Sequence, residues 1–253
     1  MSNTVKLLLE FHQLSELVLL IDHDQDLSYI FKCLSKLHNL RRLRVKVFYG
    51  YWYHNRPNPL NDLGKVIGAN LNLTHLELFL NKFTHVSCSA IFGHVPADSP
   101  LKLEHLSISD SFTDIEAIVP HIRFLTSINF YASYDQILPV LHSERIFPPF
   151  IQISVIRDHL VDYLRDHPRI VSLFIHSFYG EVTGATILGI MARHSESLKY
   201  FSITSLGFFS CLRSAQNELL LQQCTKLNQL MLVPPLFYDG GIPREFVSEQ
   251  SLE

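Results

Sequence analysis

A short apolar phrase recurs along almost the whole chain, and this repeat limits the possible folds more than any other feature. Its clearest copy runs from Leu73 to Phe83 and fits L-x-x-L-x-L-x-x-N-x-L, with Phe83 as the last hydrophobic residue. One match would mean little in a chain that is 47% hydrophobic. Nine copies, however, recur 22 to 33 residues apart, and a period of this size predicts a stack of repeats. Their second apolar residues are Leu17, Leu43, Leu76, Leu106, Ile128, Ile151, Leu173, Phe201 and Leu230.

Each copy predicts one β-strand followed by one helix. Apolar residues alternate with period two inside the phrase, as in a strand with one buried face. Asp26, Asp62, Asp114 and Asp158 each precede a segment with helical spacing, where a carboxylate would cap free backbone N–H groups. The six predicted helical segments are 27–37, 63–70, 115–122, 159–166, 185–194 and 216–223.

Stacked strand–helix units joined by short turns predict an α/β fold of one kind. It is a curved right-handed solenoid with parallel strands on the concave side and helices on the convex side. We expect a single domain over 1–253, with an N-terminal cap in 1–13, nine irregular repeats in 14–233 and a C-terminal cap or tail in 234–253. The alternative is a doubly wound α/β domain, which also alternates strand and helix; the repeated phrase favours the solenoid.

The phrase resembles the repeat of the leucine-rich-repeat superfamily, of the ribonuclease-inhibitor-like kind, over nearly the whole chain. Two copies carry a further likeness. Cys224 to Leu232 fits C-x-x-L-x-x-L-x-L, and the segment from His167 to Ile170 is similar to C-P-x-L. These copies resemble the irregular repeats that follow an F-box in ubiquitin-ligase adaptors, particularly fungal ones.

The resemblance implies a non-catalytic protein–protein interaction module. Its expected setting is substrate recognition in an F-box-type, cullin-based ubiquitin ligase. Thirteen residues precede Leu14, too few for an F-box helical module, so we expect that module to be absent or encoded upstream.

The composition of the chain disfavours several classes of protein. The chain has 21 basic and 24 acidic residues, a formal charge of −3, which disfavours a nucleic-acid binder held by bulk charge. Four cysteines without a C-x-x-C pair favour a reducing compartment, cytoplasmic or nuclear, over a disulfide framework. No apolar run approaches the roughly 18 residues of a membrane span. We expect a monomer or one subunit of a larger complex.

The concave sheet face is the predicted binding surface, because strand residues that flank the buried ones point outward. We expect the partner to be a protein with an acidic segment that also carries a hydrophobic residue. The candidate contacts are Arg42, Arg44, Lys46, His75, Glu77, Phe79 and His105, with Tyr51, Trp52 and Tyr53 from an insertion that either binds or forms a lid. Other side chains predicted to point outward are Val18, Leu20, Ser107, Ser127, Asn129, Phe150, Gln152, Ser172, Phe174, His176, Tyr200 and Ser202.

Two alternatives compete with a pure interaction module. His75, His105 and Glu77 share one face on neighbouring strands, and two histidines with a carboxylate can bind zinc; no fourth ligand is evident. A solenoid that senses a small ligand would instead hold a deep pocket on its concave face. No catalytic signature such as G-x-S-x-G or H-E-x-x-H occurs, so we expect no enzymatic activity and no cofactor.

Overall fold

The computed structural model describes residues 13–21, 26–47, 59–80, 86–108, 112–130, 136–178, 182–212 and 214–233. Its main feature is one nine-stranded parallel sheet in which each strand pairs with the next in chain order. The strands are β1 (Glu16–Ile21), β2 (Arg42–Val47), β3 (His75–Phe79), β5 (His105–Ile108), β7 (Ser127–Phe130), β8 (Phe150–Ile156), β9 (Ser172–Phe178), β10 (Tyr200–Ile203) and β11 (Gln229–Leu232).

The register of the sheet confirms the predicted strands. Leu17 pairs with Leu43, which pairs in turn with Leu76. The same column continues without a slip to Phe201 and Leu230 on the last two strands. Register is fixed in this way because a shift of one residue would turn every buried side chain to the opposite face.

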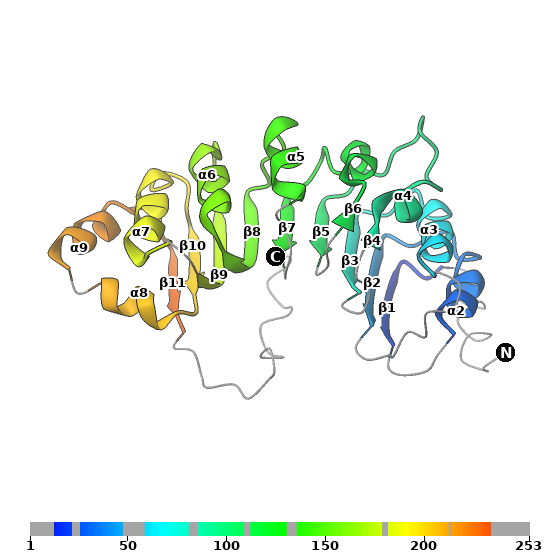
Figure 1. Ribbon diagram of the computed structural model, residues 1–253, viewed down its shortest axis with the longest axis horizontal. Coiled ribbons are helices and arrows are strands. Elements are labelled where there is room, and N and C mark those ends of the chain that lie inside the picture. Colours follow the sequence, from blue (N-terminus) through cyan, green and yellow to red (C-terminus); the bar gives the residue numbers. More distant parts are fainter. Residues whose placement is uncertain are drawn as a thin grey trace.

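Helices connect the strands and lie along the outer side of the curved sheet (Figure 1). They are α2 (Leu27–Leu34), α3 (Leu60–Gly68), α4 (Cys88–Phe92), the 3-10 helix η1 (Ile115–His121), α5 (Ile137–Ser143), α6 (Asp158–Asp166), α7 (Gly184–Arg193), α8 (Leu206–Cys211) and α9 (Ala215–Gln222). Two residue pairs, β4 (Val86–Ser87) and β6 (Phe112–Thr113), form a second small parallel sheet. A helix forms at each of the six segments named from the sequence, the one at 115–122 as the 3-10 helix η1. The helices α4 and α5 lie in units for which no segment was named, and α8 is an additional helix before α9.

The core lies between the sheet and the helices. Leu76, Leu106 and Ile128 are fully buried on successive strands, and helix residues such as Leu63 and Ile187 are buried in the same core. The prediction that the ninth copy buries its apolar residue equally is wrong, since Leu230 is 38% exposed. It lies on β11, which has a paired strand on only one side.

One of the four predicted helix caps forms as expected. Asp26 precedes α2, and its side chain accepts a hydrogen bond from the Tyr29 backbone N–H at 3.1 Å. Asp62 instead lies inside α3, and Asp158 is the first residue of α6. Asp114 precedes η1 but makes no capping bond, and its backbone is left-handed with φ 54°.

Asp62 does not act as the predicted helix cap. It is buried between α2 and α3, where it accepts hydrogen bonds from the Ser28 hydroxyl and the Lys65 ammonium group, both at 2.8 Å. Burial by itself raises the pKa of Asp62, but these two bonds and the positive charges of Lys65 and Lys32 together outweigh it and hold the pKa below its usual range. The carboxylate therefore joins two consecutive helices rather than capping one.

Buried polar side chains after the helices tie each unit to the one before it. Asn70 donates to Leu37 O and accepts from the Leu40 backbone N–H, both at 2.8 Å. His167 Nε2 donates to Pro148 O at 3.1 Å, and His194 Nε2 donates to Leu164 O at 2.7 Å. These bonds satisfy backbone groups that would otherwise be buried without partners.

Parts of the expected organisation fall outside the described residues, including the predicted N-terminal cap and everything after 233. Within the described ranges, no helix combines the length and apolarity needed to cross a membrane. The four cysteines are free thiols.

Candidate binding face of the parallel sheet

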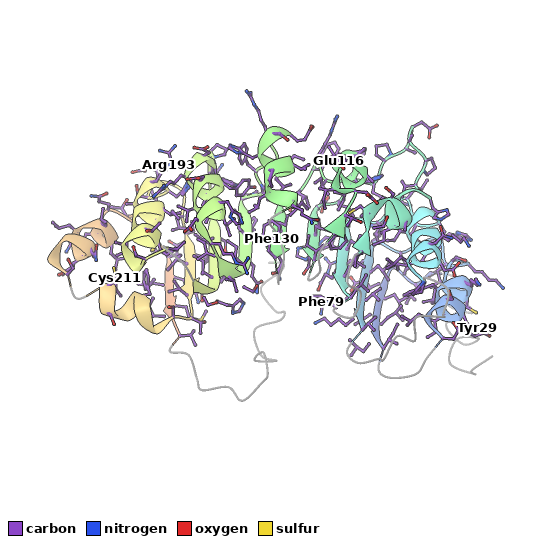
Figure 2. All side chains as sticks on the ribbon, in the orientation of Figure 1. Tyr29, Phe79, Glu116, Phe130, Arg193 and Cys211 are labelled. Carbon is purple, nitrogen blue, oxygen red and sulfur yellow. The ribbon has the colours of Figure 1, made fainter. Side chains whose placement is uncertain are left out.

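The side of the sheet opposite the helices is the candidate site, and we call it the concave face. Figure 2 shows the labelled Glu116 and Arg193 on the helical side, whereas Phe79 lies on the sheet. The helices that the structure describes leave this face uncovered (Figure 1). Its first two columns in strand order are Glu16, Arg42, His75, His105, Ser127, Phe150, Ser172, Tyr200 and Gln229, then Val18, Arg44, Glu77, Ser107, Asn129, Gln152, Phe174, Ser202 and Met231.

The first part of this face, on β1, β2 and β3, carries charges that are largely paired. Arg44 donates to Glu77 at 2.5 Å, and these two side chains are only 26% and 17% exposed. Arg42 lies 3.5 Å from Glu16 on the other side. The predicted basic residues Arg42, Arg44 and Lys46 therefore lie together on β2, and we call them the basic rung. Two of its three positive charges already have carboxylate partners.

Lys46, the third member of the rung, interacts with an aromatic ring. Its ammonium nitrogen lies 4.5 Å from the centre of the Phe79 ring, within the range of a cation–π contact. Burial, followed by the neighbouring positive charge of Arg44, lowers the pKa of Lys46. The structure thus brings together Lys46 and Phe79, two of the candidate contacts.

His75 and His105 are neighbours on adjacent strands, as the repeat predicts. Their rings stack with centroids 5.7 Å apart. Thr74 Oγ1 lies 2.9 Å from His75 Nδ1, and Ser127 Oγ lies 3.1 Å from His105 Nδ1. Burial lowers both pKa values, that of His105 to about 4, so both imidazoles are neutral at pH 7.

The metal alternative gains no geometric support. Glu77, its third predicted ligand, is held by Arg44. Over the part of the chain that the structure describes, no three His, Cys, Asp or Glu side chains are placed to share an ion. The stacked histidines instead form a polar ladder with the hydroxyl groups beside them.

The middle of the face departs from the prediction that its side chains are exposed. Ser107 on β5 and Asn129 on β7 are paired in register and are 0% and 8% exposed. Small side chains in a row of larger ones are easily covered, and Ser107 has Glu77 and Asn129 on either side. Ser107 Oγ and Asn129 Oδ1 are buried without a hydrogen-bond partner among the protein groups that the structure describes, an arrangement that costs stability.

The last part of the face, on β8, β9 and β10, is aromatic. Phe150 is 43% exposed, while Phe174 and Tyr200 are half-buried. Ser172 stands between Phe150 and Tyr200 in the first column and is buried, as is Ser202 beside Phe174, so the prediction that these two serines are exposed is wrong. Like Ser107, both serines have larger side chains beside them in register.

Two polar side chains border these rings. Gln152 Nε2 and His176 Nε2 lie 3.2 Å apart on adjacent strands, and both side chains are half-buried. Burial lowers the pKa of His176, which leaves the imidazole neutral at pH 7. The pair can offer hydrogen bonds without adding a charge to this part of the face.

The candidate contacts predicted from sequence leave this aromatic group out. A signal was available, because no Asp, Glu, Lys or Arg occurs in the predicted outward columns from β8 onward. Tyr51, Trp52 and Tyr53 lie outside the described residues, so their role as anchors or lid stays a prediction. Comparison of the chain with protein-family models gives no match, and comparison with curated proteins gives none either.

Proposed function

We propose that this chain is a non-catalytic module that binds a partner protein through its concave face. The observation that carries the proposal is apolar exposure on a sheet face that the described helices leave uncovered. Val18 is 56% exposed, Leu20 63% and Phe150 43%. These side chains lie on two separate strands of the face, β1 and β8, and exposed apolar side chains on an open face favour an interaction surface.

We assign the architecture to the leucine-rich-repeat solenoids. The support is that the same phrase supplies every strand of the main sheet in one unbroken register. Each of the first eight strands of this sheet is followed, before the next strand of the sheet, by at least one helix, the shortest of five residues. Such stacks present an extended surface for binding.

Catalysis at the most enzyme-like pair is disfavoured on physical grounds. His105 and Ser127 are hydrogen-bonded in the way a base and a nucleophile would be. A general base works best when its pKa lies near the working pH, whereas burial lowers the pKa of His105 to about 4. The pair is better suited to hydrogen bonding with a partner.

The proposed biological setting is substrate recognition in an F-box-type ubiquitin ligase, on the strength of the C-x-x-L-like copies. The proposed partner carries an acidic segment that reaches Arg42, Arg44 and Lys46. That segment would compete with Glu16 and Glu77, so charge would contribute more to the rate of association than to affinity.

Comparative affinity purification tests the proposal. Phe150→Ser and the double variant Arg42→Glu/Arg44→Glu change the concave face, while Phe124→Ser changes an exposed ring (58% exposed) just after η1. We expect the concave-face variants to lose co-purifying proteins that Phe124→Ser retains. In the F-box setting the lost proteins are substrates, whereas any co-purifying ligase subunits are retained by all variants. Partners that survive both concave-face variants and disappear only with Phe124→Ser would contradict the proposed surface.

A further inference from the structure

We infer that β8, β9 and β10 form the partner's main docking site, and that the segment bound there is an uncharged peptide with a large apolar side chain. This inference rests on the proposed function, because it concerns the same face. The inference goes beyond the proposed function because it names one part of the face and the chemistry of the segment bound there. The acidic stretch expected at Arg42, Arg44 and Lys46 becomes secondary.

Charge divides the concave face into two parts. On β1, β2 and β3 the outward columns hold Glu16, Arg42, Arg44, Lys46 and Glu77. From β8 onward these columns hold no formally charged residue. An acidic or basic segment placed there would lose its hydration without gaining an opposite charge, so a neutral segment is favoured.

The rings in the second part provide the apolar contact. Phe150 and Tyr200 lie two strands apart, about 10 Å by the usual spacing of strands, with Ser172 between them. Phe174 follows two residues after Ser172 on the same strand, so it projects on the same face. Three rings around one small residue offer apolar contacts for a large side chain of a partner.

Polar groups beside the rings match a peptide backbone. Gln152 lies two residues after Phe150 on β8, and His176 lies two residues after Phe174 on β9. Neutral amide and imidazole groups donate and accept hydrogen bonds, as peptide groups do. The site therefore combines an apolar anchor with uncharged hydrogen-bonding groups, which a neutral extended peptide can satisfy.

The experiment uses the full chain and a displayed library of random peptides. Enriched peptides are synthesised, and their affinities are measured at low and high salt for wild type, Phe150→Ser, Phe174→Ala, Arg42→Glu/Arg44→Glu and the control Phe124→Ser. Circular dichroism melting of each variant verifies that it is folded. Since Phe150 is 43% and Phe124 58% exposed, this pair compares two surface phenylalanines whose replacement leaves the core intact.

We expect enrichment of uncharged peptides with an aromatic or large aliphatic residue, and affinities that change little with salt. Phe150→Ser and Phe174→Ala should each weaken binding about tenfold or more, while the charge-reversal and Phe124 variants bind like wild type. Enrichment of acidic peptides that lose binding only with Arg42→Glu/Arg44→Glu would overturn this inference and leave the proposed function standing. If none of the concave-face variants weakens the binding of any enriched peptide, both this inference and the proposed function are contradicted.

Discussion

The clearest quantitative prediction concerns acid stability and His167. This side chain is 2% exposed, and both of its ring nitrogens are used in the neutral form. Nε2 donates to Pro148 O, and Nδ1 accepts from the Arg169 backbone N–H at 3.2 Å. Protonation would place a second donor against the Arg169 N–H and bury a charge, and burial lowers the pKa of His167 to about 4.

The pKa shift of His167 fixes the sign and size of the change in unfolding free energy with pH. His167 takes up its proton near pH 6.5 in the unfolded chain and near pH 4 in the folded chain. The stability that neutral His167 contributes is therefore fully present above pH 6.5 and is lost as the pH falls toward 4. At about 1.4 kcal/mol per pH unit, the whole interval corresponds to about 3 kcal/mol of unfolding free energy. Roughly 2 kcal/mol of this is lost between pH 7 and pH 5.

Urea unfolding of wild type and His167→Asn at the two pH values tests this. Asparagine does not titrate, and Asn70 shows that it can fill a buried position after a helix and bond to the preceding unit. The variant will be less stable at high pH through altered packing, but its free energy of unfolding should fall by about 2 kcal/mol less on acidification. Equal losses in both proteins would show that His167 is not held neutral by the fold.

Four further substitutions test the packing. Gly64→Ala should lower the free energy of unfolding by about 2 kcal/mol, because its Cβ would lie 2.3 Å from Ala90 O, whereas Gly189→Ala, with nothing within 4 Å, should raise it by about 0.5–1 kcal/mol; thermal melts of the pair suffice. Ser107→Ala should stabilise by about 1 kcal/mol in urea titration, since it removes a buried unpartnered hydroxyl. Asp62→Ala should destabilise by about 1–3 kcal/mol in the same titration, because Ser28 loses its acceptor.

The strands could be predicted because their apolar alternation repeats nine times, and each copy fixes the register of the next. Short helices carry much less signal. α4 has five residues and α8 six, fewer than two turns each, so no apolar stripe can establish itself in their sequence. The expected cap at Asp62 failed because the helix begins at Leu60, a boundary that spacing alone does not fix.

At the candidate site, the ion pairs could be predicted from the sequence but the burial of the small side chains could not. Sequence columns place Arg44 beside Glu77 and Glu16 beside Arg42, so their ion pairs were within reach of the repeat pattern. The burial of Ser107 was not, because it depends on the volumes of neighbouring side chains across strands. Outward direction along a strand does not guarantee exposure when larger residues flank a small one.

The most direct test of the central claim places a photoreactive phenylalanine analogue at Phe150 in one protein and at Phe124 in another. Both positions are exposed, one on the concave face and one outside it. After irradiation with the partner bound, mass spectrometry identifies what each position touches. The concave-face account predicts cross-links to the partner from position 150 and none from position 124. Cross-links from position 124 alone would contradict it.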